Sequence, residues 1–348
     1  MLVGIPKTRN NKTRMKRSNN LYSEICSMAN LYTAHACAKR GKSWYDEVKM
    51  LDSDPTYYLG LIQEQLINKT YHTSDYIIFT RFDGIKERTI YKLPYYPDRI
   101  VHWAILNVIE KIFIKSFTAD TYSAIPKRGI KYGVNRVLND LKDVNGCKYC
   151  LKLDVRKFYT SIDHDILKAK YRRLIKDKDL LWLLDEIVYS VKDGVPIGNY
   201  LSQYFGNLYL SSFDHWIKEV KRVKYYHRYM DDIVIFADNK PYLHDLLKDI
   251  REYMMTELKL TLKDNYQIFP TTVRGVDFLG YRFFGNKTLL RKRTYKTMRR
   301  KMCKLAKKTD LTDSDRSSIY SYDGWLDLCN GEGLRRKYLE PLKARCSK

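Results

Sequence analysis

The stretch Tyr229-Met230-Asp231-Asp232 lies between two apolar segments, residues 223–229 and 233–237. This arrangement predicts a β-hairpin with two acids at its tip. Adjacent carboxylates raise each other's proton affinity, and a divalent cation relieves that cost. Hard cations such as Mg2+ take oxygen ligands and leave positions open for substrate phosphates. The stretch therefore predicts a metal-binding hairpin, with an exposed turn as the alternative.

A further acid, Asp154, ends the apolar segment 148–154. If that segment is a strand beside the hairpin, Asp154 and Asp231 point to one place. Phosphoryl-transfer sites with two metal ions need several carboxylates that converge from different strands. The two segments together predict such a site.

The charge of the chain favours a polyanionic partner. Its 348 residues carry 64 Lys and Arg against 40 Asp and Glu, a net charge of +24, which nucleic acid would balance. Thirty tyrosines suit base stacking, although most are expected to be half-buried structural residues. Residues 287–308 hold eleven Lys and Arg and no acid, which predicts a basic helix that grips a nucleic-acid backbone. The basic cluster at 7–17 would bind RNA or form a disordered tail.

Seven scattered cysteines do not form a disulfide framework. Cys147 and Cys150 are a close pair, but no second pair completes a zinc site, so incidental thiols in a reducing cytosol are expected. No apolar run has the length of a signal peptide core or a membrane span. These features predict a cytoplasmic protein with no membrane contact.

Strands alternate with helices along the chain, which predicts an α+β fold. Apolar spacing predicts helices over 21–41, 99–114, 131–141, 180–188, 201–220, 243–258 and 317–328, and a helix pair over 46–68. The expected strands are 76–80, 89–93, 148–154, 223–229 and 233–237, with a strand pair over 276–284.

Several motifs, in order, resemble those of reverse transcriptases. They are Pro97-Asp98-Arg99-Ile-Val, Ala124-Ile-Pro-Lys-Arg128-Gly129, residues 151–163, Tyr229–Asp232, Val276-Asp-Phe-Leu-Gly280-Tyr, and Ser321-Tyr-Asp-Gly324-Trp325-Leu. The resemblance implies a right-hand polymerase whose antiparallel palm sheet packs on helices. It implies a basic tail over 1–20, fingers over 21–145, a palm over 146–285 with a fingers-linked segment at 165–200, and a helical thumb over 286–348.

The resemblance also implies an RNA-directed DNA polymerase that uses two Mg2+ ions, or Mn2+, and dNTPs. Its catalytic and metal-binding residues would be Asp154, Asp231 and Asp232, with Val155 at the metals. The dNTP-binding residues would be Tyr159, Phe158, Lys157, Arg156, Ile197, Gly198, Asn199, Lys92 and Arg99. The template and primer contacts would be Arg128, Gly129, Ser202, Gln203, Tyr229, Met230, Phe278, Leu279, Gly280, Lys292, Arg293, Arg299 and Arg300.

Some of these roles have structural alternatives. Tyr159 would exclude a 2′-hydroxyl or simply fill the palm core, and Lys92, Arg99 and Arg128 would contact phosphates or form ordinary surface charge. The lysine that the family carries after the palm helix is not evident. Tyr266 matches its place, and Lys263 is nearby but out of register.

The string Ile197-Gly198-Asn199-x-x-Ser202-Gln203 narrows the resemblance. Retron and group II intron enzymes carry Gln-Gly-(Ser/Thr)-x-x-Ser-Pro there, whereas this form looks like enzymes of diversity-generating retroelements. That subtype implies a template-repeat RNA copied into cDNA with errors at adenines, and a small basic accessory protein in an oligomeric ring. Ile197 cannot donate the hydrogen bond of a Gln amide, which favours weak discrimination.

Two alternatives stay open. A retron, group II-like or defence-associated reverse transcriptase would lack the mutagenic role. An inactive RNA-binding protein would keep the fold alone, and the intact Asp154, Asp231 and Asp232 argue against it. The chain ends soon after the expected thumb, without a maturase, endonuclease or RNase H extension, which agrees with the compact retroelement enzymes.

Overall fold

The computed structural model describes residues 16–83 and 86–346. Residues 7–15 of the predicted basic cluster lie outside this range. The chain divides into two compact units, which are described separately. Unit 1 comprises Met1–Lys115 and His164–Ser202, and unit 2 comprises Ser116–Asp163 and Gln203–Lys348. The finer division into fingers, palm and thumb stays a prediction.

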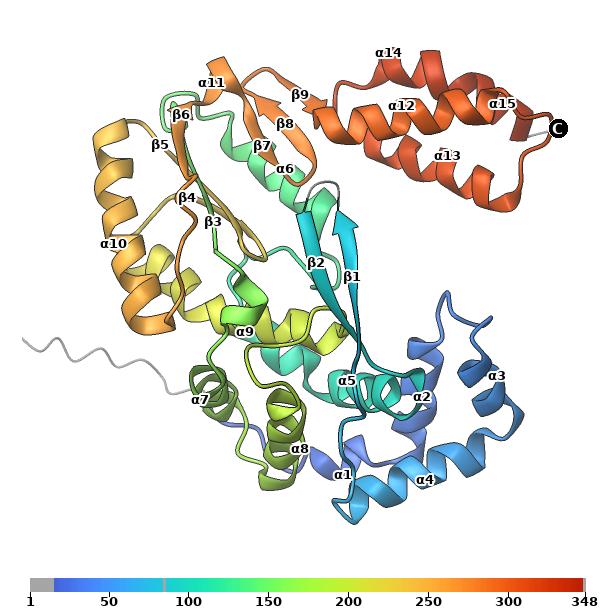
Figure 1. The fold of residues 1–348 in the computed structure, drawn as a ribbon. Helices are drawn as coiled ribbons and strands as arrows, with labels where there is room; N and C mark the ends of the chain where they lie inside the picture. The colour runs from blue at the N-terminus through green and yellow to red at the C-terminus, as the bar shows by residue number, and fades with distance from the viewer. Residues whose placement is uncertain (1–15, 84–85, 347–348) are drawn as a thin grey trace, which may run out of the picture. The chain divides into compact units, whose positions relative to one another are not determined.

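Unit 1 is mainly helical and is built around α5 (Figure 1). This helix buries residues on most of its circumference and packs against α1 and α2. A two-stranded antiparallel hairpin, β1–β2, completes the unit. Its elements are α1 (Tyr22–Ile25), α2 (Met28–Ala38), α3 (Asp46–Ser53), α4 (Pro55–Ile67), β1 (Ile77–Asp83), β2 (Lys86–Lys92), the turn η1 (Tyr95–Arg99), α5 (Ile100–Lys115), α7 (His164–Leu174) and α8 (Lys178–Tyr189).

Local capping explains where the first helices begin. The predicted helix over 21–41 is wrong as a single element, because Ser27 caps α2 by accepting a hydrogen bond from the Asn30 amide. The predicted helix pair over 46–68 is present. Asp54 caps α4 by accepting from the Tyr57 amide, and Pro55 takes the first helical position, where no amide hydrogen is needed.

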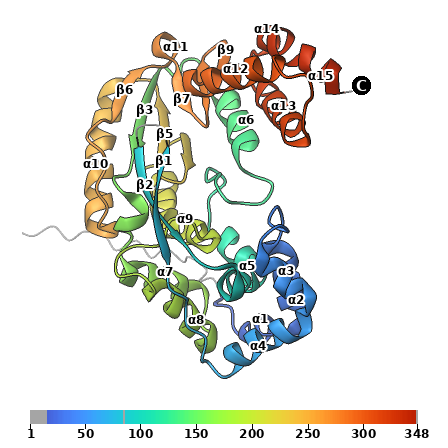
Figure 2. The same ribbon diagram turned by 45° about the vertical axis from the view of Figure 1, so that its right-hand side comes forward.

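Unit 2 contains a four-stranded antiparallel sheet in the order β4-β5-β3-β6. Helices α10 and α6 lie on opposite sides of it (Figure 1 and Figure 2). Val234 and Phe236 share a core with α6, so alternation turns Ile233 and Ile235 toward the other face. The bounds are α6 (Ile130–Asp140), β3 (Tyr149–Asp154), η2 (Phe158–Ser161), α9 (Tyr200–His215, entering from unit 1), η3 (Trp216–Val220), β4 (Tyr225–Tyr229), β5 (Asp232–Ala237), α10 (Lys240–Leu258), β6 (Gln267–Pro270) and α11 (Thr271–Arg274).

The C-terminal part of unit 2 is a small sheet followed by a helical group. The sheet has the order β7-β8-β9, and the rest of the part comprises α12, α13, α14, η4 and α15. Leu279 and Gly280 both have positive φ, which makes a two-residue hairpin between β7 and β8. The bounds are β7 (Val276–Phe278), β8 (Tyr281–Phe284), β9 (Lys287–Leu290), α12 (Lys292–Ala306), α13 (Asp313–Leu326), α14 (Glu332–Leu334), η4 (Arg335–Leu339) and α15 (Glu340–Cys346).

The predicted basic helix over 287–308 is wrong at its start. Residues 287–290 form strand β9, where buried Thr288 and Leu290 alternate with exposed Lys287 and Leu289. The helix begins only at Lys292 and buries Met298, Met302 and Leu305 on one face. Antiparallel sheets with helices confirm the α+β class. Across residues 16–83 and 86–346, no helix combines the length and apolar character that a bilayer span requires.

Candidate active site

Three aspartates meet at one end of the four-stranded sheet. The backbone register pairs Asp154, the last residue of β3, with Asp232, the first residue of β5. Such antiparallel partners have Cα atoms about 4.5–5.5 Å apart. Asp231 lies in the two-residue turn between β4 and β5, where Met230 has a φ of 53°. We call Asp154, Asp231 and Asp232 the carboxylate site.

Lysines contact two of these acids. Residues 261–263 run alongside 154–156, and the Lys263 amide donates to the Asp154 carbonyl at 2.9 Å. The Lys263 Nζ then reaches Asp154 Oδ1 at 2.6 Å. Tyr266, which matched the family lysine by register, instead stacks under the Arg251 guanidinium at 4.9 Å. Lys263, expected nearby but out of register, is therefore the lysine that contacts Asp154.

Lys152 contacts the second acid, and sequence reasoning missed it. Its Nζ lies 3.4 Å from Asp232 Oδ1 and also donates to the backbone carbonyl of Asp277. Burial raises the pKa of Asp232 to about 6, against the opposing effect of Lys152 and with a further increase from Asp154. Alternation alone turns Lys152 and Asp154 to the same face of β3, which was the available signal.

A buried arginine supports the turn from beneath. Arg228 and Asp214 are both fully buried and form an ion pair at 2.5 Å. Arg228 Nη1 donates to the Met230 carbonyl at 2.9 Å and to Asn207 Oδ1 at 3.2 Å. Its Nη2 also lies 3.3 Å from Thr121 Oγ1. This network fixes the Met230 carbonyl in the turn between β4 and β5, next to Asp231 and Asp232.

The carboxylate site offers donors that suit a hard divalent cation. All its side-chain donors are carboxylate oxygens, and Asp232 Oδ1 is buried without a hydrogen-bond partner among the described residues. Within residues 16–83 and 86–346, no three His, Cys, Asp or Glu side chains already stand close enough to form a metal cluster. The lysine contacts would therefore have to give way on metal binding.

The close cysteine pair consists of two buried thiols. All seven cysteines are free thiols, and Cys147 and Cys150 are buried. Burial raises the pKa of Cys147 to about 12, and the pKa of Cys150 is also raised. Both thiols are therefore protonated at neutral pH in the metal-free protein.

The turn that follows Asp154 packs aromatic rings against α9. Val155 and Phe158 are buried, Tyr159 is half-buried, and Arg156 and Lys157 are exposed. A Cβ atom at Gly206 would lie 3.1 Å from the Phe158 ring and 3.7 Å from the Tyr159 ring. The rings therefore sit directly over the glycine of α9.

Within unit 1, four residues predicted to bind dNTPs line one pocket of about 210 Å3, which we call the Lys42 pocket. They are Lys92, Arg99, Gly198 and Asn199. The neighbouring Ile197 carbonyl accepts a hydrogen bond from the Tyr91 amide at 2.9 Å, which ties the Ile197–Asn199 string to β2. The other lining residues are Lys42, Tyr45, Phe79, Ile90, Tyr91, Leu93, Pro94, His102, Trp103 and Tyr200.

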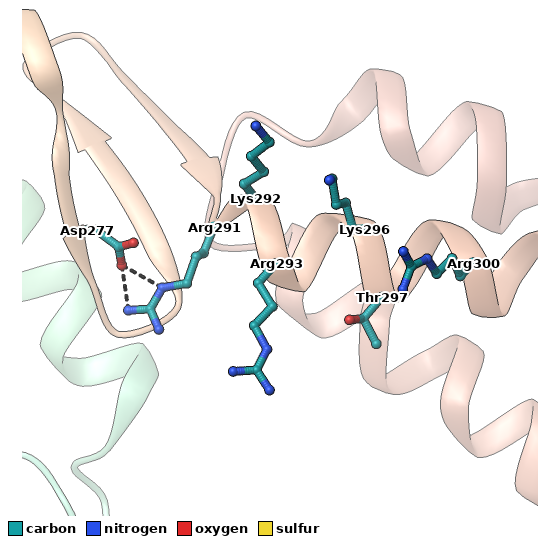
Figure 3. A pocket seen from close by; sticks show the side chains of 7 residues that line it. All are labelled: Asp277, Arg291, Lys292, Arg293, Lys296, Thr297 and Arg300. Carbon is teal, nitrogen blue, oxygen red and sulfur yellow. Dashed lines mark hydrogen bonds and ion pairs between the residues drawn. The ribbon is translucent and has the colours of Figure 1, made fainter. Parts of the chain in front are cut away.

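A second cavity, of about 520 Å3, lies at the start of α12 and is strongly basic (Figure 3). Lys292, Arg293 and Arg300 line it, as do Asp277, Arg291, Lys296 and Thr297. Figure 3 shows Arg291 turned back onto Asp277, to which it pairs at 2.5 Å. Arg299, another predicted contact, does not line this cavity. Its positive charge instead acts on the Tyr338 hydroxyl, whose pKa it tends to lower.

The remaining predicted template and primer residues are placed as follows. Arg128 donates to the carbonyls of Thr118 and Thr121, and Gly129 precedes α6 with a φ of 99°. Ser202 and Gln203 lie in α9. Phe278 and Leu279 bury their side chains, so that at the β7–β8 turn their backbone is what a ligand can reach. A Cβ atom at Gly280 would lie 2.5 Å from Trp325.

The sequence profile described as reverse transcriptase (RNA-dependent DNA polymerase) matches residues 84–283. The chain therefore belongs to the reverse transcriptase family. The predicted fold is confirmed, and residues 84–283 form a domain of the predicted class, the RNA-dependent DNA polymerases.

Individual relatives are distant. Protein YkfC of Escherichia coli is 24% identical over 247 residues, which cover 58% of this chain and 63% of that protein. An uncharacterized 91 kDa protein in the cob intron of Schizosaccharomyces pombe is 25% identical over 134 residues, or 36% of this chain and 16% of that protein. The chain thus spans less than two thirds of each.

One of the similar solved structures, a telomerase, shares the fold at a TM-score above 0.5. The Candida albicans enzyme in complex with a TWJ fragment of telomeric RNA has a TM-score of 0.51 at 12% identity, over 71% of this chain and 55% of that chain. The apo enzyme of Candida tropicalis has a TM-score of 0.47 at 13% identity, over 62% and 48%. At these identities, the first of the two supports the fold alone.

Proposed function

We propose that this reverse transcriptase copies a template-repeat RNA into cDNA with frequent errors at template adenines, as the enzyme of a diversity-generating retroelement. Its partners would be that RNA, the cDNA, dNTPs and a small basic accessory protein in a ring. The free state of all seven cysteines supports a reducing cytoplasm.

We assign Asp154 and Asp231 to hold two Mg2+ ions, with Asp232 in support and Val155 beside them. Bound there, the ions would lower the pKa of the primer 3′-hydroxyl and stabilise charge on the leaving pyrophosphate. In the metal-free protein, the positive charge of Lys263 is paired with Asp154 and that of Lys152 with Asp232. Tyr159, over Gly206, would meet the sugar of the incoming nucleotide and favour a deoxyribose.

The observation that carries the mutagenic role is the Ile197-Gly198-Asn199 string. Gly198 has a φ of 130°, and a Cβ atom there would meet the Tyr91 carbonyl at 2.7 Å. Asn199 is buried, and its Nδ2 lies 3.4 Å from the Tyr76 hydroxyl. Ile197 directly precedes these two residues and is half-buried, and its side chain offers no hydrogen bond to a base pair, which supports low discrimination.

The test is sequencing of cDNA made by the wild-type enzyme and by Ile197→Gln and Ile197→Leu variants. Ile197→Gln should lower misincorporation opposite adenine, because the amide restores a polar contact near the nascent pair. Ile197→Leu keeps the apolar character and should keep the wild-type error rate. Equal adenine errors in all three proteins would contradict the proposal, and faithful wild-type cDNA would favour a retron-like, group II-like or defence-associated enzyme.

A further inference from the structure

Two segments of unit 1 that are far apart in the sequence run side by side. They are residues 16–20, before α1, and residues 173–178, where α7 ends and α8 begins, and together we call them the Ser18 surface. The Ser18 amide donates to the Leu174 carbonyl at 2.8 Å, and the Ser18 carbonyl accepts from the Lys176 amide at 2.9 Å. These two bonds form a parallel bridge, so the side chains of the two segments lie close together.

The Ser18 surface is densely basic. Its two segments hold five cations against one acid. The two apolar residues among them, Leu174 and Ile175, are buried. The exposed residues are cations and amides alone: Lys16, Arg17, Asn19, Asn20, Arg173, Lys176 and Lys178.

The acid of this surface is engaged by the backbone. Asp177 is buried, and its two carboxylate oxygens accept from two amides at the start of α1 and two at the start of α8. It thereby acts as the N-terminal cap of α8. Of the acids that lie close by in the chain, Asp179 pairs with Lys69 at 2.5 Å, and Glu24 is exposed on α1. The five cations therefore exceed the negative charge around them.

Other cations of α7 have counterions within unit 1. Lys168 and Arg172 lie 3.4 and 2.5 Å from Asp185. Among the residues that the structure describes, no carboxylate pairs with the five cations of the Ser18 surface. The dipole of α7 favours Arg173 in its last turn, but the dipole of α8 disfavours Lys178 at its first position. Helix electrostatics alone does not account for this charge, whereas a polyanionic partner does.

The exposed side chains narrow the polyanion to a nucleic-acid helix. Proteins hold single strands with aromatic rings on which bases stack, and they enter membrane surfaces with apolar side chains. The Ser18 surface exposes neither. Asn19 Nδ2 donates to Asn20 Oδ1 at 2.8 Å, which leaves the Asn20 amide nitrogen and the Asn19 oxygen for a partner. Cations beside such amides suit the phosphates and 2′-hydroxyls along the minor groove of double-stranded RNA.

We propose that the Ser18 surface binds the sugar–phosphate backbone of double-stranded RNA, in a folded part of the RNA that the enzyme copies. The surface includes two residues of the predicted basic cluster at 7–17 and extends it to a helix junction for which no binding role was predicted. It belongs to unit 1, whereas the carboxylate site belongs to unit 2. The proposal rests on the copying of RNA and not on errors at adenines, so its test measures binding and not misincorporation.

The test uses the full chain and three paired variants. Arg173→Gln/Lys176→Gln removes two cations of the surface, and Arg173→Lys/Lys176→Arg keeps both charges. Lys111→Gln/Lys115→Gln removes two exposed charges of α5, in the same unit, as the control. The Kd for a labelled RNA duplex of about 16 base pairs is measured by fluorescence anisotropy at several salt concentrations. An unlabelled short RNA–DNA template–primer is present at saturation to occupy the site of synthesis.

Arg173→Gln/Lys176→Gln should weaken binding of the RNA duplex by roughly tenfold and lower the salt slope by about two, one for each lost phosphate contact. The pair that keeps both charges and the α5 control should bind like the wild type. The melting temperature and the rate of primer extension on the short template–primer should be unchanged in all variants, because the surface serves RNA outside that duplex.

An unchanged Kd in Arg173→Gln/Lys176→Gln would overturn the proposal, as would an equal loss in the α5 control, since that reflects overall charge. An equal loss with a DNA duplex of the same length would overturn the choice of RNA. A larger loss with single-stranded RNA, or with vesicles that contain phosphatidylserine, would overturn the choice of a helix. Faithful cDNA would end the mutagenic role without changing any of these binding results.

Discussion

The carboxylate site of unit 2 and the Lys42 pocket of unit 1 differ in whether their charged side chains have counterions. At the carboxylate site, Lys263 pairs with Asp154 and Lys152 pairs with Asp232. In the Lys42 pocket, Lys42, Lys92 and Arg99 gather without an acid in the lining. The acids are provided with internal counterions, whereas these cations are not.

The difference shows where the protein depends on its ligands. A lysine ammonium can take the place of a metal ion beside a carboxylate, so the carboxylate site is stable before any ion binds. The Lys42 pocket has no such substitute, and its repulsion remains until an anion arrives. The variants below test whether the counterions at the carboxylate site act in this way.

Removal of a carboxylate should have the largest effect. Asp231→Asn should lower the primer-extension rate with Mg2+ by roughly 10³-fold or more, because it deletes a metal ligand. The matched control is Asp264→Asn, which changes an exposed acid in the loop that carries Lys263. Rates are measured on an RNA template at saturating dNTP, and a decrease of less than tenfold would remove Asp231 from the metal site.

Replacement of the buried Arg228 should have the second-largest effect. Arg228→Met should cost about 3–5 kcal/mol of unfolding free energy, because it leaves Asp214 buried and unpaired. The double variant Arg228→Met/Asp214→Leu should regain most of that stability in urea unfolding. It should still need several-fold more Mg2+ for half-maximal rate, since nothing then fixes the Met230 carbonyl. A wild-type Mg2+ response in the double variant would limit Arg228 to stability.

The burial of Asp232 should make the free energy of unfolding depend on pH. Its pKa is about 6 in the folded protein and about 4 when unfolded. Between these values the folded state binds more protons, so this group's contribution to stability falls as pH rises. Metal-free Asp232→Asn should equal the wild type only below about pH 4, where the carboxyl is protonated in both states. It should be more stable by about 1–2 kcal/mol at pH 7, after allowance for the 30% exposure of the side chain.

Thermal or urea unfolding of both proteins without metal, from acid to neutral pH, measures the difference at each pH. Asp264→Asn again serves as the control and should follow the wild type throughout. A difference that shrinks as pH rises would have the wrong sign and would mean that Asp232 is not destabilised by burial.

The smallest effect is expected from a counterion. Lys263→Met removes the cation that pairs with Asp154, so the site should bind Mn2+ several-fold more tightly in an EPR titration. Lys259→Met is a suitable control, because Lys259 pairs with Asp163 and not with the carboxylate site. Weaker Mn2+ binding in Lys263→Met would show that the lysine helps to build the site rather than substituting for the ion.

The sequence predicted the part of this site that regular elements create. Two apolar segments that flank Met230-Asp231-Asp232, and a third that ends at Asp154, were enough to predict the β4–β5 hairpin and strand β3. Once those strands pair, the acids are neighbours by register. The helix over 287–308 was placed too early, because four residues of strand among so many lysines resemble a basic helix.

The missing parts depend on irregular segments and distant contacts. Lys263 reaches Asp154 because Lys259 ends α10 in a left-handed conformation and turns the chain back, and no residue pattern signals that geometry. The Lys42 pocket joins a loop near residue 42, strand β2, helix α5 and the start of α9. Some of these residues could be predicted from the sequence, but that they line one pocket follows only from the folded structure of unit 1.

Lys152 has a consequence beyond its contact with Asp232. Its ammonium is shared between that carboxylate and the backbone carbonyl of Asp277 in β7, and Asp277 in turn pairs with Arg291 at the start of α12. Loss of the carbonyl contact would leave the Lys152 ammonium to Asp232 alone and lower the pKa of that carboxyl further. The pKa of Asp232, in the four-stranded sheet, therefore depends on a contact with β7, a strand of the other sheet of unit 2.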